Sequence, residues 1–286
     1  MPAALHLPAL GHKISTNVRF AASALLFPEL AGSLAERLFL TPPRPRDAAA
    51  AALDLIEARS GMIEHKGRHI ATWRWGSLDS PAVLLVHGWG GNAAQMRAFV
   101  FPLLSAGLRV IAYDQPAHGV SEGRLTGLPD FADVLAEIVW HHGDVRAAIG
   151  HSLGATAAAL AHAANKAELR KIVLVSPPSD LVGYSRHFAR WHWIPEPVRD
   201  AMQAAIEERY GLRWSELELA RLAPRLGAQA LVIHDRADRV VPWKQGEQFA
   251  RHWQGARLMS TEGLGHRRIL QDEAVTQAAA DFICAR

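Results

Sequence analysis

Short apolar runs alternate with longer helical stretches along most of the chain. Six of the runs have the length of buried strands: Ala82–Val86, Arg109–Tyr113, Val145–Ile149, Lys171–Val175, Ala230–Ile233 and Ala256–Met259. The stretches with helical spacing are Ala93–Leu104, Leu128–His141, Leu153–Asn165, Trp243–Trp253 and Asp272–Cys284. Strands joined by crossover helices predict an α/β fold, with a mostly parallel central sheet covered by helices on both faces.

Two segments ahead of this alternation have other periods. Ile63–Gly67 and Arg68–Trp75 alternate between apolar and polar positions, which predicts a hairpin that turns near Gly67. The first sixty residues have a helical, amphipathic pattern: Val18–Leu40, a Pro-rich break at Thr41–Arg46, and Asp47–Ala58 with Asp47 as its N-cap.

We therefore expect residues 1–60 to form a helical N-terminal extension of an α/β domain that spans residues 61–286. The leucines of the first helix fall roughly on one face: Leu25, Leu26, Leu30, Leu34 and Leu38. We expect this face to pack on the body of the domain. Dimerisation, which would make the protein a homodimer, and contact with a membrane surface are the alternatives.

One connection is longer than the others. Residues 176–229 separate two of the predicted strands and contain a helical stretch at Val198–Tyr210. We expect this insertion to form a short helical cap over the carboxyl ends of the strands. Trp191 and Trp193 are expected to pack inside the cap or, alternatively, to line an acyl pocket.

Composition excludes several classes of protein. The net charge of +3 is small and the basic residues are dispersed, so we expect no nucleic-acid partner. Cys284 is the only cysteine, and no intramolecular disulfide can form. Phe20–Phe27 has the apolar character of a signal segment, but charged residues interrupt it before a membrane span is reached, and no convincing cleavage site follows. We expect a cytoplasmic protein without stable membrane insertion.

The most informative motif joins a strand to a helix. Gly150-His151-Ser152-Leu153-Gly154 follows an apolar run, and an alanine-rich helical stretch follows at once. This is the Gly-x-Ser-x-Gly nucleophile elbow in the context that it requires. The tight turn lifts the hydroxyl of Ser152 clear of the sheet, and side chains in place of Gly150 and Gly154 would collide with neighbouring elements. Ser152 is therefore the candidate nucleophile.

A serine hydroxyl needs a base, and the base needs an orienting acid. Asp238 follows the strand Ala230–Ile233, and His266 follows the last strand, so the chain supplies the order Ser, Asp, His. Both lie at strand carboxyl ends, where a parallel sheet places its ligands. Asp235 lies nearer to the end of its strand and is the alternative acid.

The strand Ala82–Val86 leads into His87-Gly88-Trp89-Gly90-Gly91. Backbone N–H groups at this position build an oxyanion hole together with the residue after the nucleophile. We assign the N–H groups of Trp89 and Leu153 as the donors. Trp89, through its indole, and His151 are the candidate substrate-binding side chains.

With these motifs the chain resembles the α/β-hydrolase superfamily from about Ile63 to the C-terminus, and in detail it is similar to uncharacterised bacterial serine esterases of this fold. Asp114-Gln115-Pro116-Ala117-His118-Gly119-Val120-Ser121 resembles the family's Asp-x-Pro-x-x-Gly-x-Ser loop, which shapes the site. The resemblance places the acid before Arg239-Val240-Val241-Pro242, which favours Asp238. The N-terminal sixty residues lie outside the common core.

These observations predict a serine hydrolase that cleaves small carboxylic esters, of short acyl chains, through an acyl-enzyme and without cofactor or metal. The adjacent His141 and His142, and the pair His187 and His192, lack the neighbours of a zinc site. Serine at the elbow excludes dehalogenases and epoxide hydrolases, which carry Asp there. Thioesterases, peptidases and carbon–carbon bond hydrolases use the same triad, and a non-catalytic ligand-binding protein could keep it as a relic. These four alternatives stay open at this point.

Overall fold

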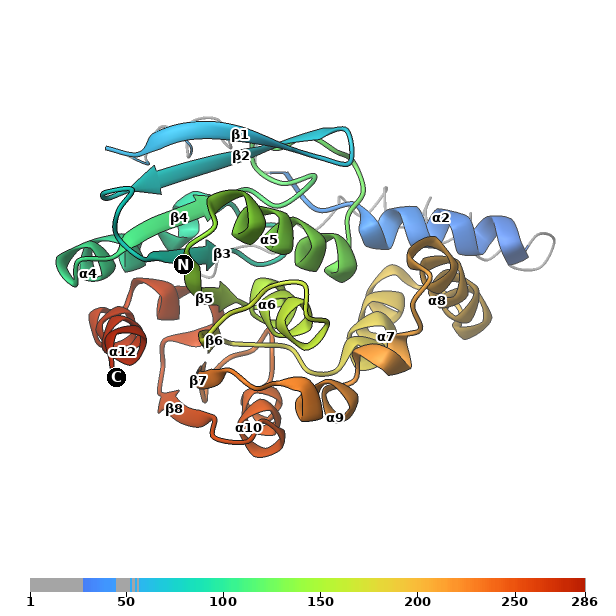
Figure 1. Ribbon diagram of the computed structural model, residues 1–286. Coiled ribbons are helices and arrows are strands. Elements are labelled where there is room, and N and C mark those ends of the chain that lie inside the picture. The colour runs from blue at the N-terminus through green and yellow to red at the C-terminus, as the bar shows by residue number, and fades with distance from the viewer. Residues whose placement is uncertain (1–27, 45–51, 53–54, 56, 286) are drawn as a thin grey trace. The chain divides into compact units, whose positions relative to one another are not determined.

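The computed structural model describes residues 28–44, 52, 55 and 57–285. Within them, one sheet has the strand order β1-β2-β4-β3-β5-β6-β7-β8 (Figure 1). The strands β3 to β8 run parallel to one another, whereas β2 is antiparallel both to β1, with which it forms the preceding hairpin, and to β4. The bounds are β1 Arg59–His65, β2 Arg68–Trp75, β3 Ala82–Val86, β4 Arg109–Tyr113, β5 Val145–His151, β6 Lys171–Val175, β7 Gln229–Asp235 and β8 Arg257–Thr261. The predicted α/β class, hairpin and strand positions are confirmed.

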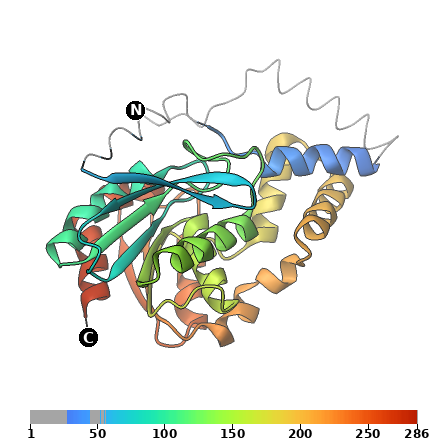
Figure 2. The same ribbon diagram turned by 45° about the horizontal axis from the view of Figure 1, so that its top comes forward.

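Helices cover both faces of the sheet (Figures 1 and 2). One face carries η1 (Ala93–Phe99), α4 (Val100–Ser105) and α12 (Glu273–Cys284), and the other carries α5 (Leu128–His142), α6 (Leu153–Ala163) and α10 (Trp243–His252). Strand β3 is buried at every position, and its residues Val83 and Leu85 belong to the apolar core under α12. Burial on both faces is the reason for its uninterrupted apolar run.

The predicted helix 93–104 is divided into η1 and α4. Pro102 has no backbone N–H, and proline is tolerated in the first turn of an α-helix but not deeper inside one. The α-helical part therefore begins only at Val100, two residues before the proline.

The described chain forms two compact units. The smaller unit combines the described part of Met1–Thr41 with Asp180–Glu216, and the larger contains Pro42–Ser179 and Leu217–Arg286. The smaller unit contains α2 (Pro28–Leu40), α7 (Leu181–His192) and α8 (Glu196–Tyr210); short helical turns, η2 (Trp214–Leu217), α9 (Leu219–Leu222) and η3 (Ala223–Arg225), lead back to β7. The insertion after β6 is helical, as expected.

In the smaller unit, α2 lies alongside α8 (Figures 1 and 2). The buried residues of α2 include the small Ala31, Gly32 and Ala35 as well as Glu36 and Leu40, and a Cβ added to Gly32 would lie 2.8 Å from that of Ala201. Leu30 and Leu34 are 56% and 47% exposed, so the expectation that the leucines form the buried face is wrong for these two. Small residues face α8 because they let the two helix backbones approach closely.

The two tryptophans of the insertion also differ from the expectation. Helix α7 begins at Asp180, whose carboxylate accepts the N–H of Gly183, and ends before Trp193, which has a left-handed φ of 56°. Trp193 is 68% exposed and Trp191 39% exposed. The expectation that both tryptophans pack inside the cap is therefore wrong. Their position at the end of α7 turns much of their surface to solvent.

Some expectations lie wholly or partly outside the described residues: the helix before Pro28, Leu25 and Leu26, and most of the helix 47–58. The packing of residues 1–60 on the α/β domain stays a prediction. In the part of the chain that the structure describes, no helix has both the length and the apolar character needed to cross a bilayer.

Candidate active site

Ser152 stands in the tight turn between β5 and α6. Its backbone has φ 51° and ψ −125°, which is a strained conformation for a residue with a side chain. The hydroxyl forms no capping hydrogen bond to α6, and the residue is partly exposed. The backbone N–H of Ser152 donates to the carbonyl of Val175 at 2.8 Å, which ties the turn to β6. The strain is thus held in place by the sheet, and the hydroxyl is left free of local structure.

Glycines allow the turn to pack tightly. A Cβ on Gly150 would lie 2.5 Å from the Cα of Ala155, and one on Gly154 would lie 2.6 Å from the carbonyl oxygen of Val86. A Cβ on Gly88 would lie 2.9 Å from the Cβ of Ser152. The contacts of Gly88 and Gly154 show that the loop after β3 lies directly against the elbow, as an oxyanion loop requires.

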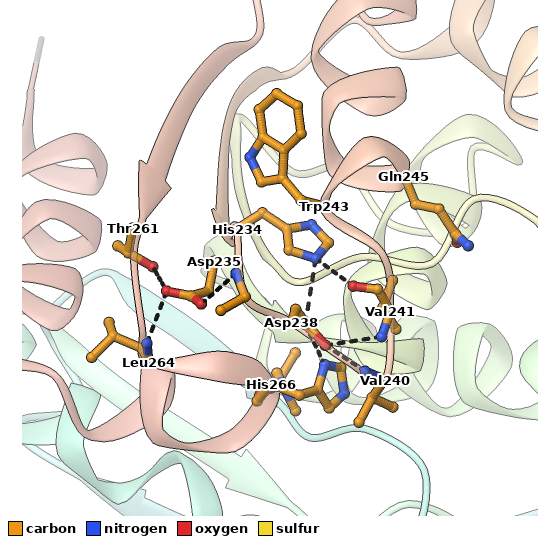
Figure 3. Close-up of polar contacts among 12 residues, drawn as sticks. His234, Asp235, Asp238, Val240, Val241, Trp243, Gln245, Thr261, Leu264 and His266 are labelled. Carbon is orange, nitrogen blue, oxygen red and sulfur yellow. Dashed lines mark hydrogen bonds and ion pairs between the residues drawn. The ribbon is translucent and has the colours of Figure 1, made fainter.

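His266 and Asp238 form a hydrogen bond across two loops (Figure 3). The Nδ1 of His266 lies 2.7 Å from Oδ2 of Asp238. His266 belongs to the one-turn helix α11 (Gly265–Arg268) after β8, and Asp238 belongs to the loop after β7. With Nδ1–H donating to the carboxylate, the Nε2 of a neutral His266 carries a lone pair and is available as a base.

The surroundings of Asp238 favour its ionised form. Burial alone would raise its pKa, but His234, His266 and the backbone N–H of Val241 more than offset this, and the pKa lies well below its usual value. The carboxylate oxygen Oδ1 accepts from the N–H groups of Val240 and Val241 at 2.8 and 2.9 Å. The Nε2 of His234 lies 3.4 Å from Oδ2 and 3.0 Å from the carbonyl of Val241. Asp238 is therefore a fixed negative charge beneath His266.

Asp235, the alternative acid, has other partners (Figure 3). Its carboxylate accepts from the hydroxyl of Thr261 at 2.7 Å, from the N–H of Leu264 at 3.0 Å and from the N–H of Ala237 at 2.9 Å. No hydrogen bond joins Asp235 to His266 among the described residues. These hydrogen bonds connect the loop after β8 to the end of β7, so Asp235 has a structural role.

His151 connects the elbow to the His266 loop. Its Nε2–H donates to the backbone carbonyl of His266 at 2.9 Å, and the two rings are 4.7 Å apart between centroids. The side chain is buried, which together with the nearby His266 lowers its pKa to about 3. His151 is therefore neutral, and it holds the residue beside Ser152 against the main chain of His266. A direct contact with substrate stays a prediction.

The loop of residues 87–91 after β3, the candidate oxyanion loop, is held by neutral histidines. The N–H of Gln115 donates to Nε2 of His87 and the N–H of Gly90 donates to Nε2 of His118, both at 2.9 Å. Because a backbone N–H can only donate, each Nε2 must carry the lone pair, so each ring is neutral with its proton on Nδ1. Burial lowers the pKa of both histidines, that of His118 to about 4.

Trp89 occupies the centre of this loop. Its indole lies against His118, with ring centroids 5.3 Å apart, and is stacked on Phe131 at 6.3 Å. Within the described residues, no hydrogen-bond partner is assigned to the backbone N–H of Trp89 or to that of Leu153. These are the two donors that the sequence proposes for the oxyanion hole.

A family model for the alpha/beta hydrolase fold matches residues 81–192, which include the loop after β3 and the elbow. Among solved structures, the Pyrococcus furiosus esterase Pf2001 superposes with a TM-score of 0.64 at 22% identity, covering 85% of this chain and 98% of that one. A predicted hydrolase from Thermoplasma acidophilum superposes with a TM-score of 0.61 at 17% identity, covering 79% of this chain and 98% of that one. The chain has the α/β-hydrolase fold, and its residues 81–192 match the family model of that fold.

Curated relatives match this chain over a short region or at low identity. A human serine hydrolase-like protein is 30% identical over 118 residues, which is 38% of this chain and 56% of the relative. A bifunctional esterase/perhydrolase from Acinetobacter calcoaceticus is 24% identical over 243 residues, 67% of this chain and 87% of the relative. The match thus spans just over half the length of the human protein. Hydrolases named as esterases are among the relatives at low identity.

Sequence reasoning missed three contributors to the site of this α/β-hydrolase: His234, His118 and Arg44. His234 immediately precedes Asp235 and faces Asp238, a pairing that only the turn after β7 creates. His118 lies inside the Asp114–Ser121 motif, so the motif could have indicated it. Nothing in the local pattern around Arg44 indicates its partners, which lie more than seventy positions away in sequence. Within the described residues, no group of three potential metal ligands is present.

Proposed function

We propose that this α/β-hydrolase is a serine esterase that cleaves carboxylic esters through an acyl-enzyme. The observation that carries the proposal is the 2.7 Å hydrogen bond between His266 and an ionised, buried Asp238. The contact of His151 with the His266 main chain brings this pair to the strained elbow of Ser152. Nucleophile, base and acid of a triad are thus supported by the fold at three different strand ends.

The chemistry follows from these positions. Ser152 Oγ attacks the ester carbonyl carbon while Nε2 of His266 takes the hydroxyl proton, and the carbonyl π electrons move to oxygen. The N–H groups of Trp89 and Leu153 donate to that oxyanion. When the intermediate collapses, His266 returns the proton to the leaving alkoxide oxygen and an alcohol departs. Water then repeats the sequence on the acyl-enzyme and releases the acid.

The fixed charge of Asp238 stabilises the imidazolium that forms on His266 in both steps. His151 stays neutral because of its lowered pKa, so it adds no positive charge that would oppose this imidazolium. Asp238 therefore contributes a negative charge next to the base, and the neutral His151 contributes no positive one.

We propose short acyl chains as substrates. The bulky indole of Trp89 is fixed against His118 and Phe131 beside the oxyanion loop, which limits the room next to the acyl group. Trp191 and Trp193 are exposed and give no support to this point. The proposal includes a small-molecule ester as the partner and no cofactor. Location in the cytoplasm and a homodimeric state also stay proposals.

The test is hydrolysis of p-nitrophenyl acetate, butyrate and octanoate by wild type, by Ser152→Ala and by the control Ser77→Ala, which changes an exposed serine. We expect turnover that prefers the shorter esters, a loss of about 10⁴-fold or more in kcat for Ser152→Ala, and no loss for the control. A fluorophosphonate probe should label Ser152 in wild type and serves as a readout when the variant does not fold.

Other outcomes would change the assignment. A preference for chains of about ten carbons or longer contradicts the short-acyl proposal. Labelling of Ser152 without ester turnover would redirect the search to thioesters, amides or carbon–carbon bonds. Absence of both would favour a ligand-binding relic.

A further inference from the structure

The segment after α2 enters the larger unit and contacts the loop 114–123. The side chain of Arg44 donates to three backbone carbonyls of that loop: from Nε to Ala117 at 2.8 Å, and from Nη2 to Ser121 at 2.9 Å and to Gly123 at 3.0 Å. One planar guanidinium thus gathers three carbonyls that point to a common centre. Its rigid fork of donors is suited to this task, whereas the single ammonium of lysine is not.

The turn that Arg44 holds has an unusual backbone. Ala117 has a φ of 63°, and Gly119 and Gly123 have φ values of 49° and 116°. A left-handed conformation at an alanine is unfavourable on its own and persists only where contacts over-determine it. The hydrogen bond from Arg44 to the carbonyl of Ala117 is such a contact, and the Ala117 N–H donates to Glu122 at 2.9 Å as a second one.

This turn carries His118, which connects it to the oxyanion loop. His118 Nδ1–H donates to the carbonyl of Pro116 at 3.0 Å, and Nε2 accepts the N–H of Gly90 at 2.9 Å. Gly90 directly follows Trp89, so His118 fixes the peptide next to the one that supplies an oxyanion donor. Pro43 closes the other side, because a Cβ on Gly90 would lie 2.9 Å from its Cγ.

We propose that Arg44 is a positioning residue for ester hydrolysis: it holds the turn of Ala117 so that His118 fixes the oxyanion loop and the N–H of Trp89. This inference rests on the proposed function and deepens it. It also assigns a task in the site to a segment that precedes the first strand of the sheet. Arg44 touches no reacting atom, so it acts through geometry alone.

Electrostatics supports the same arrangement. His118 serves as an acceptor for Gly90 only while its ring is neutral. Burial lowers its pKa to about 4, and the positive charge of Arg44 contributes in the same direction. Arg44 therefore holds the position of the acceptor, and its charge adds to the larger effect of burial on the protonation state.

The experiment compares wild type with Arg44→Gln, Arg44→Lys and His118→Ala in the full chain. The matched control is Arg124→Gln, which removes the same charge from an exposed arginine next to the same loop. Active sites are titrated with a fluorophosphonate, and kcat and KM for p-nitrophenyl butyrate are expressed per titrated site. Affinity for a trifluoromethyl ketone, which binds serine hydrolases as an oxyanion adduct, is measured alongside.

We expect kcat per active site to fall about tenfold in Arg44→Gln, with KM within about twofold. That is less than the ~10²–10³-fold loss from removing an oxyanion donor, because Arg44 acts indirectly. Affinity for the ketone should fall in parallel, Arg44→Lys should recover little, and His118→Ala should lose at least as much as Arg44→Gln. Arg124→Gln should behave as wild type.

Two results would overturn the inference. One is an unchanged kcat per active site in Arg44→Gln, even if fewer sites titrate or the melting temperature drops, since that result describes support of folding only. The other is a loss that appears in KM and not in kcat or ketone affinity. A wild type that is neither labelled nor active on esters would instead overturn the proposed function, and this inference with it.

Discussion

Two groups of histidines lie at the carboxyl ends of the sheet, and their rings have different partners. On the oxyanion side, defined here by His87, His118 and His151, buried neutral rings bind backbone groups. On the acid–base side, defined by His234, Asp238 and His266, two rings share one ionised carboxylate. The difference lies in burial and in the partner: burial lowers the pKa values of His87, His118 and His151 and keeps these rings neutral, whereas the rings of the second group lie against the ionised carboxylate of Asp238.

The two sides should be sensitive to different kinds of substitution. The oxyanion side depends on close packing, with glycines at Gly88, Gly150 and Gly154 that tolerate no added atom. The acid–base side depends on one charge and its hydrogen bonds. Steric substitutions should therefore damage folding on the first side, and charge substitutions should damage chemistry on the second.

The largest expected effect is on the acid–base side. Asp238→Asn presents an amide in place of the fixed charge beneath His266, which favours the wrong tautomer of the ring. We expect kcat to fall about 10³–10⁴-fold with the fold retained. The matched variant Asp235→Asn removes a neighbouring charge that contacts Thr261 and Leu264 instead, and it should stay within about tenfold of wild type. Equal losses in the two variants would contradict the assignment of Asp238 as the acid. Both are measured by steady-state ester hydrolysis.

A smaller effect, on stability, is expected on the oxyanion side. In Gly154→Ala the new Cβ would overlap the carbonyl groups of Val86 and His87, so strand and helix must separate. We expect the free energy of unfolding to fall by about 3 kcal/mol or more, measured by denaturant titration. Gly227→Ala is the control, because a Cβ there meets nothing within 4 Å. It should change stability by no more than about 1 kcal/mol. Similar stabilities for the two variants would show that the elbow is less tightly packed than described.

The smallest effect is the contribution of a neutral histidine to pH dependence. His118 has a folded pKa of about 4, below the value of 6.5 that it regains on unfolding. The unfolded chain therefore binds a proton that the folded chain does not. The neutral His118 therefore makes its full contribution to the free energy of unfolding above pH 6.5. This contribution is lost as the pH falls towards 4.

Denaturant titrations at about pH 7, 6 and 5 test this. In wild type the free energy of unfolding should fall as the pH is lowered. In His118→Gln this fall should be smaller, by up to about 1.4 kcal/mol per pH unit. The control is His187→Gln, at an exposed position, and it should keep the wild-type slope. An unchanged slope in His118→Gln would contradict a neutral buried ring.

The strands and the elbow were predictable from the sequence because their signals are local. Buried strands such as β3 are continuous apolar runs, and the elbow combines a run, a motif and a helix within about twenty residues. The link between His266 and Asp238 followed from their positions after two strands, because parallel strand ends meet at one edge.

The parts that were not predictable depend on contacts between distant segments. Periodicity identified the leucines of α2 but not which face is buried, since the partner helix selects the small face of Ala31 and Ala35. The hydrogen bonds of Arg44 and His118 join backbone groups, which have no residue-type signature. The exposure of Trp193 depends on its position at the end of α7, which the apolar character of the side chain does not reveal.

The close packing of Gly32 against Ala201 couples two stretches of sequence separated by about 170 positions. A residue larger than glycine at one position requires a compensating change at the other, so the two helices must be inherited together. Chimeras with other α/β-hydrolases should therefore exchange residues 28–40 and 196–210 as a pair. A crossover between them would join mismatched surfaces, even where every strand of the sheet is preserved.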